Sequence, residues 1–237
     1  LHKEYRRQRQ MCIRDSPWTL DYVDAATYVH DSHGSENWVR RLTIPEYVAT
    51  VKAVTGVKIE TEARGLLPPD IRADGFSNTA YNLKVDFKHV EAFAKLAEII
   101  VKRMDVFAFA KRFHNKLTLD KQARTLMERM GKWVLRGPLD EREILLYRGI
   151  TTTMASGGGK FNEAVGSAIE AMLQSPRFVY RMEDQQAGGP VEGYELAVRM
   201  SYLLWGGPPD EELYRAADKG LSLIHISEPT RRTPISY

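Results

Sequence analysis

The amino-acid sequence predicts a mostly α fold, a multi-helix orthogonal bundle with a long ordered loop, built as one body or as two helical subdomains. Three observations predict it. Apolar residues recur at helical spacing along most of the chain, helix caps and stops bracket these segments, and no segment alternates convincingly between apolar and polar residues. The 237 residues are enough for one large domain or two small ones.

The two ends of the chain, residues 1–16 and 221–237, are predicted to be translated sequencing adapter, an artefact rather than protein. With one choice of codons, the DNA that encodes Leu221–Ser227 is the reverse complement of the DNA that encodes Met11–Ser16. Two unrelated termini have no physical reason to share an inverted DNA repeat, whereas an adapter attached to both ends of a gene fragment has one. Such segments carry no information on the fold, and we expect them to pack poorly.

The charge of the chain changes when these ends are set aside. The whole sequence has 34 Lys and Arg against 31 Asp and Glu, a net charge of +3. The ends hold 7 and 3 of these residues, so the part between them has a net charge of −1, which gives no support to nucleic-acid binding. The one cysteine, Cys12, also lies in an end, so we expect neither a disulfide nor a thiolate metal site. No apolar run is long enough to predict a transmembrane segment.

The first helix is predicted to follow Thr43. The hydroxyl of Thr43, a proline at position 45 and the carboxylate of Glu46 form the pattern of a capping box, and Gly56 can end the helix. An extended stretch is expected next. The prolines and the Asp74-Gly75 pair of the segment Leu66–Asn78 then forbid a continuous helix or strand, which predicts a long loop, either ordered or disordered.

Further helices are predicted wherever apolar residues recur at helical spacing between a cap and a stop. They cover Asp86 to Arg103 or beyond, Val106–Phe113, Asp120–Leu135, Asp140–Ile150, Phe161–Leu173, Tyr194–Trp205 and Pro209–Ala217. We divide the chain between its ends into four parts on this basis. Residues 17–39 would be the end of an upstream domain or a linker, 40–116 an N-terminal helical domain, 117–155 a short helical domain, and 156–220 the start of a further helical domain.

Four polar residues of the predicted long loop, Asp70, Arg72, Asp74 and Asn78, are the candidate catalytic residues. Two carboxylates with an arginine between them could act as general acid and base. The alternative is structural: the sequence Asp74-Gly75 makes a turn, Asp70 caps a helix and Arg72 pairs locally, because such residues dominate ordinary turns.

Two other groups are candidates for binding. His30 and His33 could ligate a divalent metal, although a solvated loop would have the same pattern. Aromatic side chains could form a platform for sugars or bases, or could simply pack in the core. These aromatic residues are Trp38, Trp133, Tyr194, Tyr202, Trp205 and Tyr214.

Three groups of segments together carry a recognisable pattern: RRLTIPEYVATVKAVTGV with LLPPDIRADGFSN, then WVLRGPLDEREILLYRGI, then AMLQSPRFVYRMED with GYELAVRMSYLLWGGPPDEEL. This pattern resembles planctomycete-type multidomain proteins of unknown function that are commonly associated with a c-type cytochrome domain. It covers most of the chain from Arg40 to Leu213.

The resemblance implies a fragment of a protein exported to the periplasm or cell surface. Haem c would then bind in an upstream domain, with no cofactor in this fragment, and the other domains of the parent chain would be its partners. A helical scaffold or interaction module is the leading interpretation. The alternative is part of a redox or polysaccharide-processing enzyme with a site at the loop 66–78.

Overall fold

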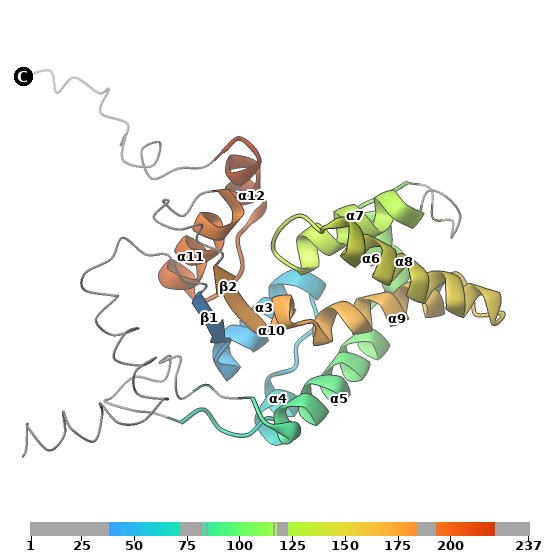
Figure 1. The fold of residues 1–237 in the computed structure, drawn as a ribbon. Coiled ribbons are helices and arrows are strands. Elements are labelled where there is room, and N and C mark those ends of the chain that lie inside the picture. Colours follow the sequence, from blue (N-terminus) through green and yellow to red (C-terminus); the bar gives the residue numbers. More distant parts are fainter. Residues whose placement is uncertain are drawn as a thin grey trace, which may run out of the picture. The chain divides into compact units, whose positions relative to one another are not determined.

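Helices form most of the described chain, which confirms the mostly α prediction (Figure 1). The computed structural model describes residues 38–71, 83, 85–115, 117, 123–183 and 193–220. Almost all of these residues belong to one unit, which comprises 39–182 and 192–237, while a second unit comprises 1–38 and 183–191. The packing predicted for the adapter-like ends therefore lies outside the described residues, and the domain boundaries stay predictions.

Ten helices and one two-stranded sheet are present in the described part of the chain. The helices are α3 (Ile44–Thr55), α4 (Glu60–Leu66), α5 (Phe87–Arg103), α6 (Val106–Lys111), α7 (Ala123–Val134), α8 (Glu141–Ser156), α9 (Phe161–Gln174), α10 (Pro176–Val179), α11 (Gly193–Trp205) and α12 (Glu211–Asp218). No helix within these residues is long and apolar enough to cross a membrane.

Helix α3 begins and ends where the sequence predicts. Thr43 and Glu46 form the expected capping box: the Glu46 N–H donates to Thr43 Oγ1 at 3.4 Å, and the Thr43 N–H donates to Glu46 Oε2 at 2.8 Å. Gly56 ends the helix with a φ of 79°, in the left-handed region that glycine enters without strain. Asp86 likewise caps α5, as predicted.

Helix α4 replaces part of the extended stretch predicted after Gly56, so that part of the prediction was wrong. Ile59 and Ala63 are fully buried, and the helix packs against α3 and α5. A single pair of apolar residues four positions apart is too short a pattern to mark a helix in a sequence. Tertiary packing therefore stabilises this helix more than its own sequence does.

The sheet is the second element that the sequence did not predict. Strand β1 (Trp38–Arg41) pairs with β2 (Tyr180–Glu183), and just beyond them the Leu42 N–H donates to the Val179 carbonyl at 2.9 Å. Because the end of β1 lies beside the start of β2, the strands run antiparallel. Strands of four residues offer too few alternations to detect, yet this pair joins segments about 140 residues apart in the sequence.

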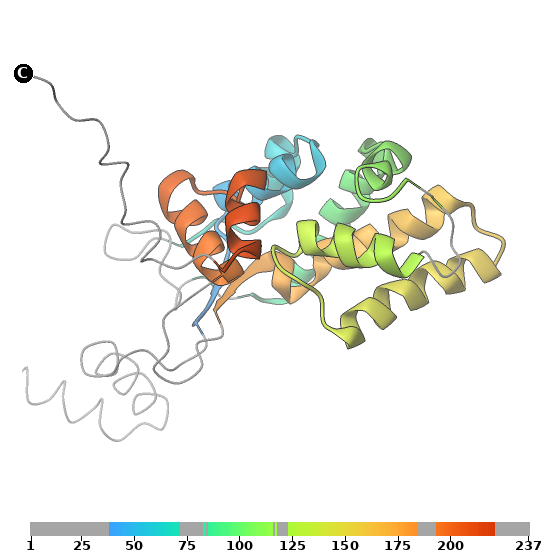
Figure 2. The same ribbon diagram turned by 90° about the horizontal axis from the view of Figure 1, so that it is seen from above.

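Helix α9 organises the core. It packs against α5, α6, α7, α8 and α10, and it lies alongside α8 in both ribbon views (Figures 1 and 2). Val165, Ala168, Ile169 and Met172 on α9 are fully buried. They belong to one hydrophobic cluster that also contains residues of α3, α5, α7 and α11.

Leucines at two helical positions test this core. Leu96 on α5 is fully buried, whereas Leu146 on α8 is 60% exposed. We expect Leu96→Ala to lower the free energy of unfolding by about 2–5 kcal/mol, because it leaves a cavity among packed side chains. Leu146→Ala should change it by less than about 0.5 kcal/mol. Urea denaturation followed by circular dichroism measures both, and equal losses would contradict the assignment of α5 to the core.

Candidate functional site

The structure describes only part of the sites that the sequence predicts. Of the candidate catalytic residues it describes Asp70. Outside the described residues lie Arg72, Asp74 and Asn78, together with the candidate metal ligands His30 and His33. Within the described part of the chain, no group of three or more His, Cys, Asp and Glu side chains could hold a metal ion.

Asp70 serves as a cap and an ion-pair partner. One oxygen of its carboxylate accepts from Arg41 Nη2 at 2.7 Å, and the other accepts from the Ile44 N–H, also at 2.7 Å. Ile44 is the first residue of α3, so Asp70 caps that helix from a distant segment. The Arg41 side chain is only 2% exposed, and its Nη1 also donates to the Leu42 carbonyl. Asp70 therefore caps a helix, as the structural alternative to a catalytic role expects. Its contacts also join the segment that begins at Arg40 to the segment that begins at Leu66.

Arg40 makes a second ion pair beside this one. Its two terminal nitrogens donate to the two oxygens of Glu46 at 2.9 and 2.7 Å, which is the bidentate geometry that strengthens such pairs. Burial by itself raises the pKa of Glu46. The hydrogen bonds from Arg40 and from the Thr43 backbone, together with the charge of Arg40, outweigh that effect and hold the pKa below its usual value of 4.5.

This lowered pKa makes the stability of the fold depend on pH. A carboxylate whose pKa is lower in the folded than in the unfolded chain stabilises the fold above its unfolded pKa, and the stabilisation is lost as the pH falls through the folded pKa. We therefore expect the free energy of unfolding to fall as the pH drops from about 5 to about 3, and Glu46→Gln to flatten that dependence. Urea titrations at several pH values measure it. Glu60→Gln, at an exposed side chain of α4, is the control and should keep the wild-type dependence.

Arg136, just after α7, joins segments that are far apart in the sequence. It is 5% exposed and has a φ of 61°, which is unusual for a residue other than glycine. Its Nη1 donates to the Phe178 carbonyl and to the Tyr202 hydroxyl, both at 3.1 Å. Its Nη2 donates to the carbonyls of Arg177 and of Tyr180, the latter at 2.8 Å. The guanidinium also lies 5.7 and 5.6 Å from the ring centres of Phe178 and Tyr202.

One more hydrogen bond extends this network to α3, and a separate one joins α7 to the same helix. The hydroxyls of Tyr202 and Thr50 are 2.6 Å apart, and both side chains are buried. The Trp133 indole donates to the Val54 carbonyl at 3.1 Å. Helices α7, α10 and α11 and strand β2 are thus joined to α3 by polar contacts inside the core.

Substitution of Arg136 tests the network. Arg136→Met keeps the apolar stem but leaves several buried acceptors without a donor, so we expect a loss of about 3–5 kcal/mol in the free energy of unfolding. Arg136→Lys should also destabilise strongly, because one ammonium cannot reach acceptors spread around a planar guanidinium. Arg142→Met, at an exposed side chain of α8, should cost less than about 0.5 kcal/mol. Similar losses for Arg136→Met and Arg142→Met would refute the role of the buried arginine.

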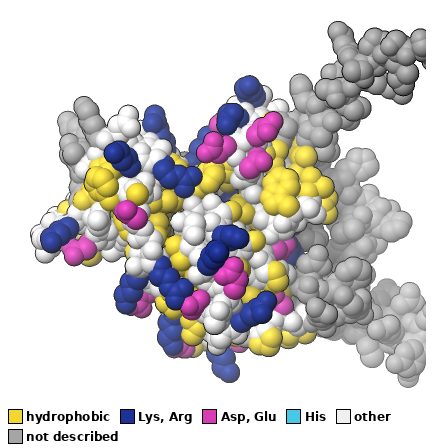
Figure 3. Space-filling view, turned by 180° about the vertical axis from the view of Figure 1, so that it is seen from behind, with side chains coloured by type: hydrophobic (Ala, Val, Ile, Leu, Met, Phe, Trp, Pro, Cys, Tyr) yellow, Lys and Arg dark blue, Asp and Glu magenta, His cyan; other side chains and the backbone are white. Residues whose placement is uncertain are grey.

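A groove formed by two adjoining cavities lies along α12, against the end of α7 and the residues that follow α6. The cavities have volumes of about 430 and 520 Å³, and both are lined by Arg112, Trp133, Glu211 and Tyr214. Each volume is within the range typical of ligand sites. Figure 3 shows hydrophobic side chains exposed between Lys and Arg side chains on one face of the molecule. We call the two adjoining cavities together the α12 groove.

Aromatic rings and a guanidinium pack together in the α12 groove. The centres of the Trp133 and Tyr214 rings are 5.5 Å apart. The Arg112 guanidinium carbon lies 5.3 Å from the centre of the Trp133 ring and 5.6 Å from that of Phe113. Arg112 is exposed yet held in place by these rings.

The predicted aromatic platform is only partly at the surface. Tyr202 and Tyr214 are 5% and 7% exposed, as the core-packing alternative expects, whereas Trp205 is 51% exposed and Trp133 is half-buried. Trp38 has no described side chain. The groove also contains Arg112 and Arg129, which the sequence analysis missed. Arg129 lies one turn before Trp133 on α7, whereas only tertiary packing brings Arg112, at the end of α6, to Trp133.

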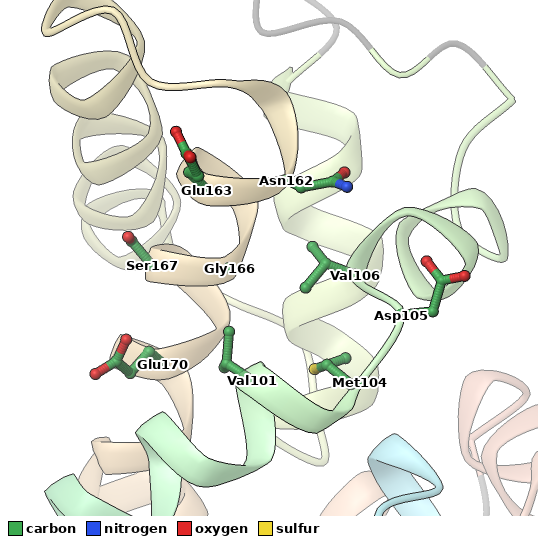
Figure 4. Close-up of a pocket in the computed structure, with 9 residues that line it drawn as sticks. All are labelled: Val101, Met104, Asp105, Val106, Asn162, Glu163, Gly166, Ser167 and Glu170. Carbon is green, nitrogen blue, oxygen red and sulfur yellow. The ribbon is translucent and has the colours of Figure 1, made fainter.

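A further cavity, of about 470 Å³, lies between α5, α6 and α9. In Figure 4 Val101 and Val106 lie toward its middle, while Asp105 and Glu170 lie on opposite sides. Asp105 is the cap of α6 and accepts from the Ala108 N–H at 2.9 Å. This cavity is therefore a seam between packed helices, lined in part by a carboxylate that caps one of them.

Comparison with known proteins identifies three families in the chain. Residues 40–106 match the family PSD3, a protein of unknown function (DUF1587). Residues 122–183 match PSD5 (DUF1595), and residues 191–224 match PSD4 (DUF1592), both also described as proteins of unknown function. No curated protein and no solved structure matches the chain. Three segments of the chain thus match families of unknown function.

Proposed function

We propose that this chain is a helical scaffold or interaction module of a longer, exported protein that carries a c-type cytochrome domain. The geometry supports a scaffold because the arginines and carboxylates in the motif segments join those segments to one another. Arg41 and Asp70 do so at the start of α3. Side chains bound in this way contribute to the stability of the fold.

The observation that carries the proposal is the position of Arg136. It lies in the segment 122–183 and donates to the Tyr202 hydroxyl in the segment 191–224. Tyr202 in turn bonds to Thr50 in the segment 40–106. The three family segments therefore share one polar network as well as one hydrophobic core. The proposed scaffold role requires all three segments to be packed together.

Asp70 bears on the enzymatic alternative. Its two carboxylate oxygens each accept a short hydrogen bond, one from a buried guanidinium and one from a helix N-terminus. A general acid or base needs an oxygen that can reach a substrate proton. This arrangement favours the scaffold over a catalytic site centred on Asp70. The cytochrome domain and export are supported by the resemblance of the motif segments alone.

The test begins with the DNA that flanks the coding segment in a longer contig. We expect the longer gene to encode a secretion signal and a Cys-x-x-Cys-His motif upstream of residue 40. Expressed in the periplasm of a host that matures cytochromes c, the product should show the pyridine haemochrome spectrum of covalent haem. A complete upstream reading frame with neither feature would contradict the proposal.

The scaffold role has its own measurement in the same product. After a protease site engineered between the haem domain and residue 38 is cut, the two pieces should still elute together in size exclusion. Arg136→Met should separate them while the haem content stays the same, and Arg142→Met should not. Pieces that separate in the wild-type protein would show that the helical body does not hold the haem domain.

A further inference from the structure

We propose that the α12 groove binds an extended acidic peptide segment of a partner protein, with one apolar side chain near its acidic residues. This inference names the partner chemistry of the interaction module and therefore rests on the proposed function. It depends on three properties of the groove: its elongated shape, its aromatic floor, and two arginines that have no carboxylate partner among the described residues.

The shape favours an extended chain. One cavity reaches from Asp210 to Tyr214 along α12, and the other from Glu211 to Asp218. The eight residues of α12 span about 12 Å, at 1.5 Å per residue. An extended peptide advances about 3.3 Å per residue, so roughly four residues would fill this length.

The apolar part of the ligand would sit at the end of the groove near Pro208. Pro208 and Pro209 line this cavity together with Trp133, Trp205 and Ala53, and the charged residues Arg112, Asp210 and Glu211 also line it. Trp205 holds this wall in place through a hydrogen bond from its indole nitrogen to the Pro208 carbonyl at 3.1 Å. A flat or branched apolar side chain can pack against such a surface, as the anchor residues of docked peptides do.

The opposite end of the groove has an excess of positive charge. Its lining contains four cationic side chains and two carboxylates: Arg112, Arg129, Lys132 and Arg215 against Glu211 and Asp218. Both carboxylates are already paired, Asp218 with Lys132 at 2.6 Å and Glu211 with Arg215 at 3.5 Å.

Arg112 and Arg129 supply the positive charge that remains. Arg129 donates to the Phe113 carbonyl at 3.2 Å, and Arg112 lies on aromatic rings. Within the part of the chain that the structure describes, neither pairs with a carboxylate. A guanidinium fixed in place loses little side-chain entropy when it binds a carboxylate in a bidentate manner.

Arg112 also decides between a peptide and a polysaccharide. A sugar ring would need the open face of an aromatic side chain, yet the Arg112 guanidinium already lies 5.3 Å from the centre of the Trp133 ring. That position instead presents guanidinium nitrogens to an incoming carboxylate. Acidic side chains of a peptide match this arrangement better than a stacked sugar does.

The test uses the full 237-residue chain and a fluorescein-labelled hexapeptide in which a phenylalanine is flanked by glutamates. Fluorescence anisotropy should show saturable binding that weakens as salt is added, because exposed charges are screened. The double variant Arg112→Glu and Arg129→Glu should weaken binding by at least about tenfold. The matched control, Arg64→Glu and Arg142→Glu, makes the same change in net charge at exposed residues outside both cavities and should bind like the wild type.

Further probes fix the chemistry of the ligand. A hexapeptide with lysines in place of the glutamates should not bind, and one with alanine in place of the phenylalanine should bind more weakly. Binding that the Arg112 and Arg129 changes leave intact overturns the proposal. So does displacement of the peptide by an oligogalacturonate at a lower concentration than by unlabelled peptide, since that would make the ligand a polysaccharide. These outcomes are independent of whether the longer gene encodes a haem domain, so either proposal can fail alone.

Discussion

The buried guanidinium of Arg136 is the interaction on which the arrangement of the chain depends. A positive charge inside a protein is costly unless polar groups replace its water, and here carbonyl and hydroxyl oxygens do so. The acceptors come from α10, β2 and α11, so each of these elements must take one position for the charge to be satisfied. Removing the hydrophobic cluster would abolish folding, but the arginine decides which helices meet. Its unusual φ of 61° is tolerated because so many contacts hold it in place.

Buried arginines with polar partners also hold the start of α3 in place. Arg40 and Arg41 are adjacent and nearly buried, and they pair with Glu46 and Asp70 respectively. The Arg40 pair joins residues 6 positions apart in the sequence, and the Arg41 pair joins residues 29 positions apart. Together they fix the entry of α3 against β1 and the loop. Arg40 and Arg41 in this segment thus serve to hold α3 in place.

How far the sequence predicts this fold depends on the range of each interaction. Capping by Thr43 and Asp86 and the stop at Gly56 are decided by neighbouring residues, and these predictions are confirmed. The short helix α4 and the two strands depend on partners elsewhere in the chain, and their own patterns are too brief to detect. Asp70 was predicted only as one of two alternatives, a helix cap or a catalytic carboxylate. The partners that distinguish these alternatives, Arg41 and the Ile44 N–H, lie outside the loop. The sequence could not predict the α12 groove for the same reason, because Arg112 and Tyr214 are about 100 residues apart in the chain.

The α12 groove lies close to the buried Arg136 network, because Tyr214 lines the groove and is near Arg136. The ring of Tyr214 forms part of the groove and packs against Trp133. Burial raises the pKa of the Tyr214 phenol, and the nearby charge of Arg136 opposes that rise. Tyr214 in the groove therefore lies close enough to the network for the charge of Arg136 to act on its phenol. Trp133 belongs to the segment 122–183 and Tyr214 to the segment 191–224, so neither segment could form the groove alone. The proposed binding surface therefore requires the assembled body, because its lining comes from both segments.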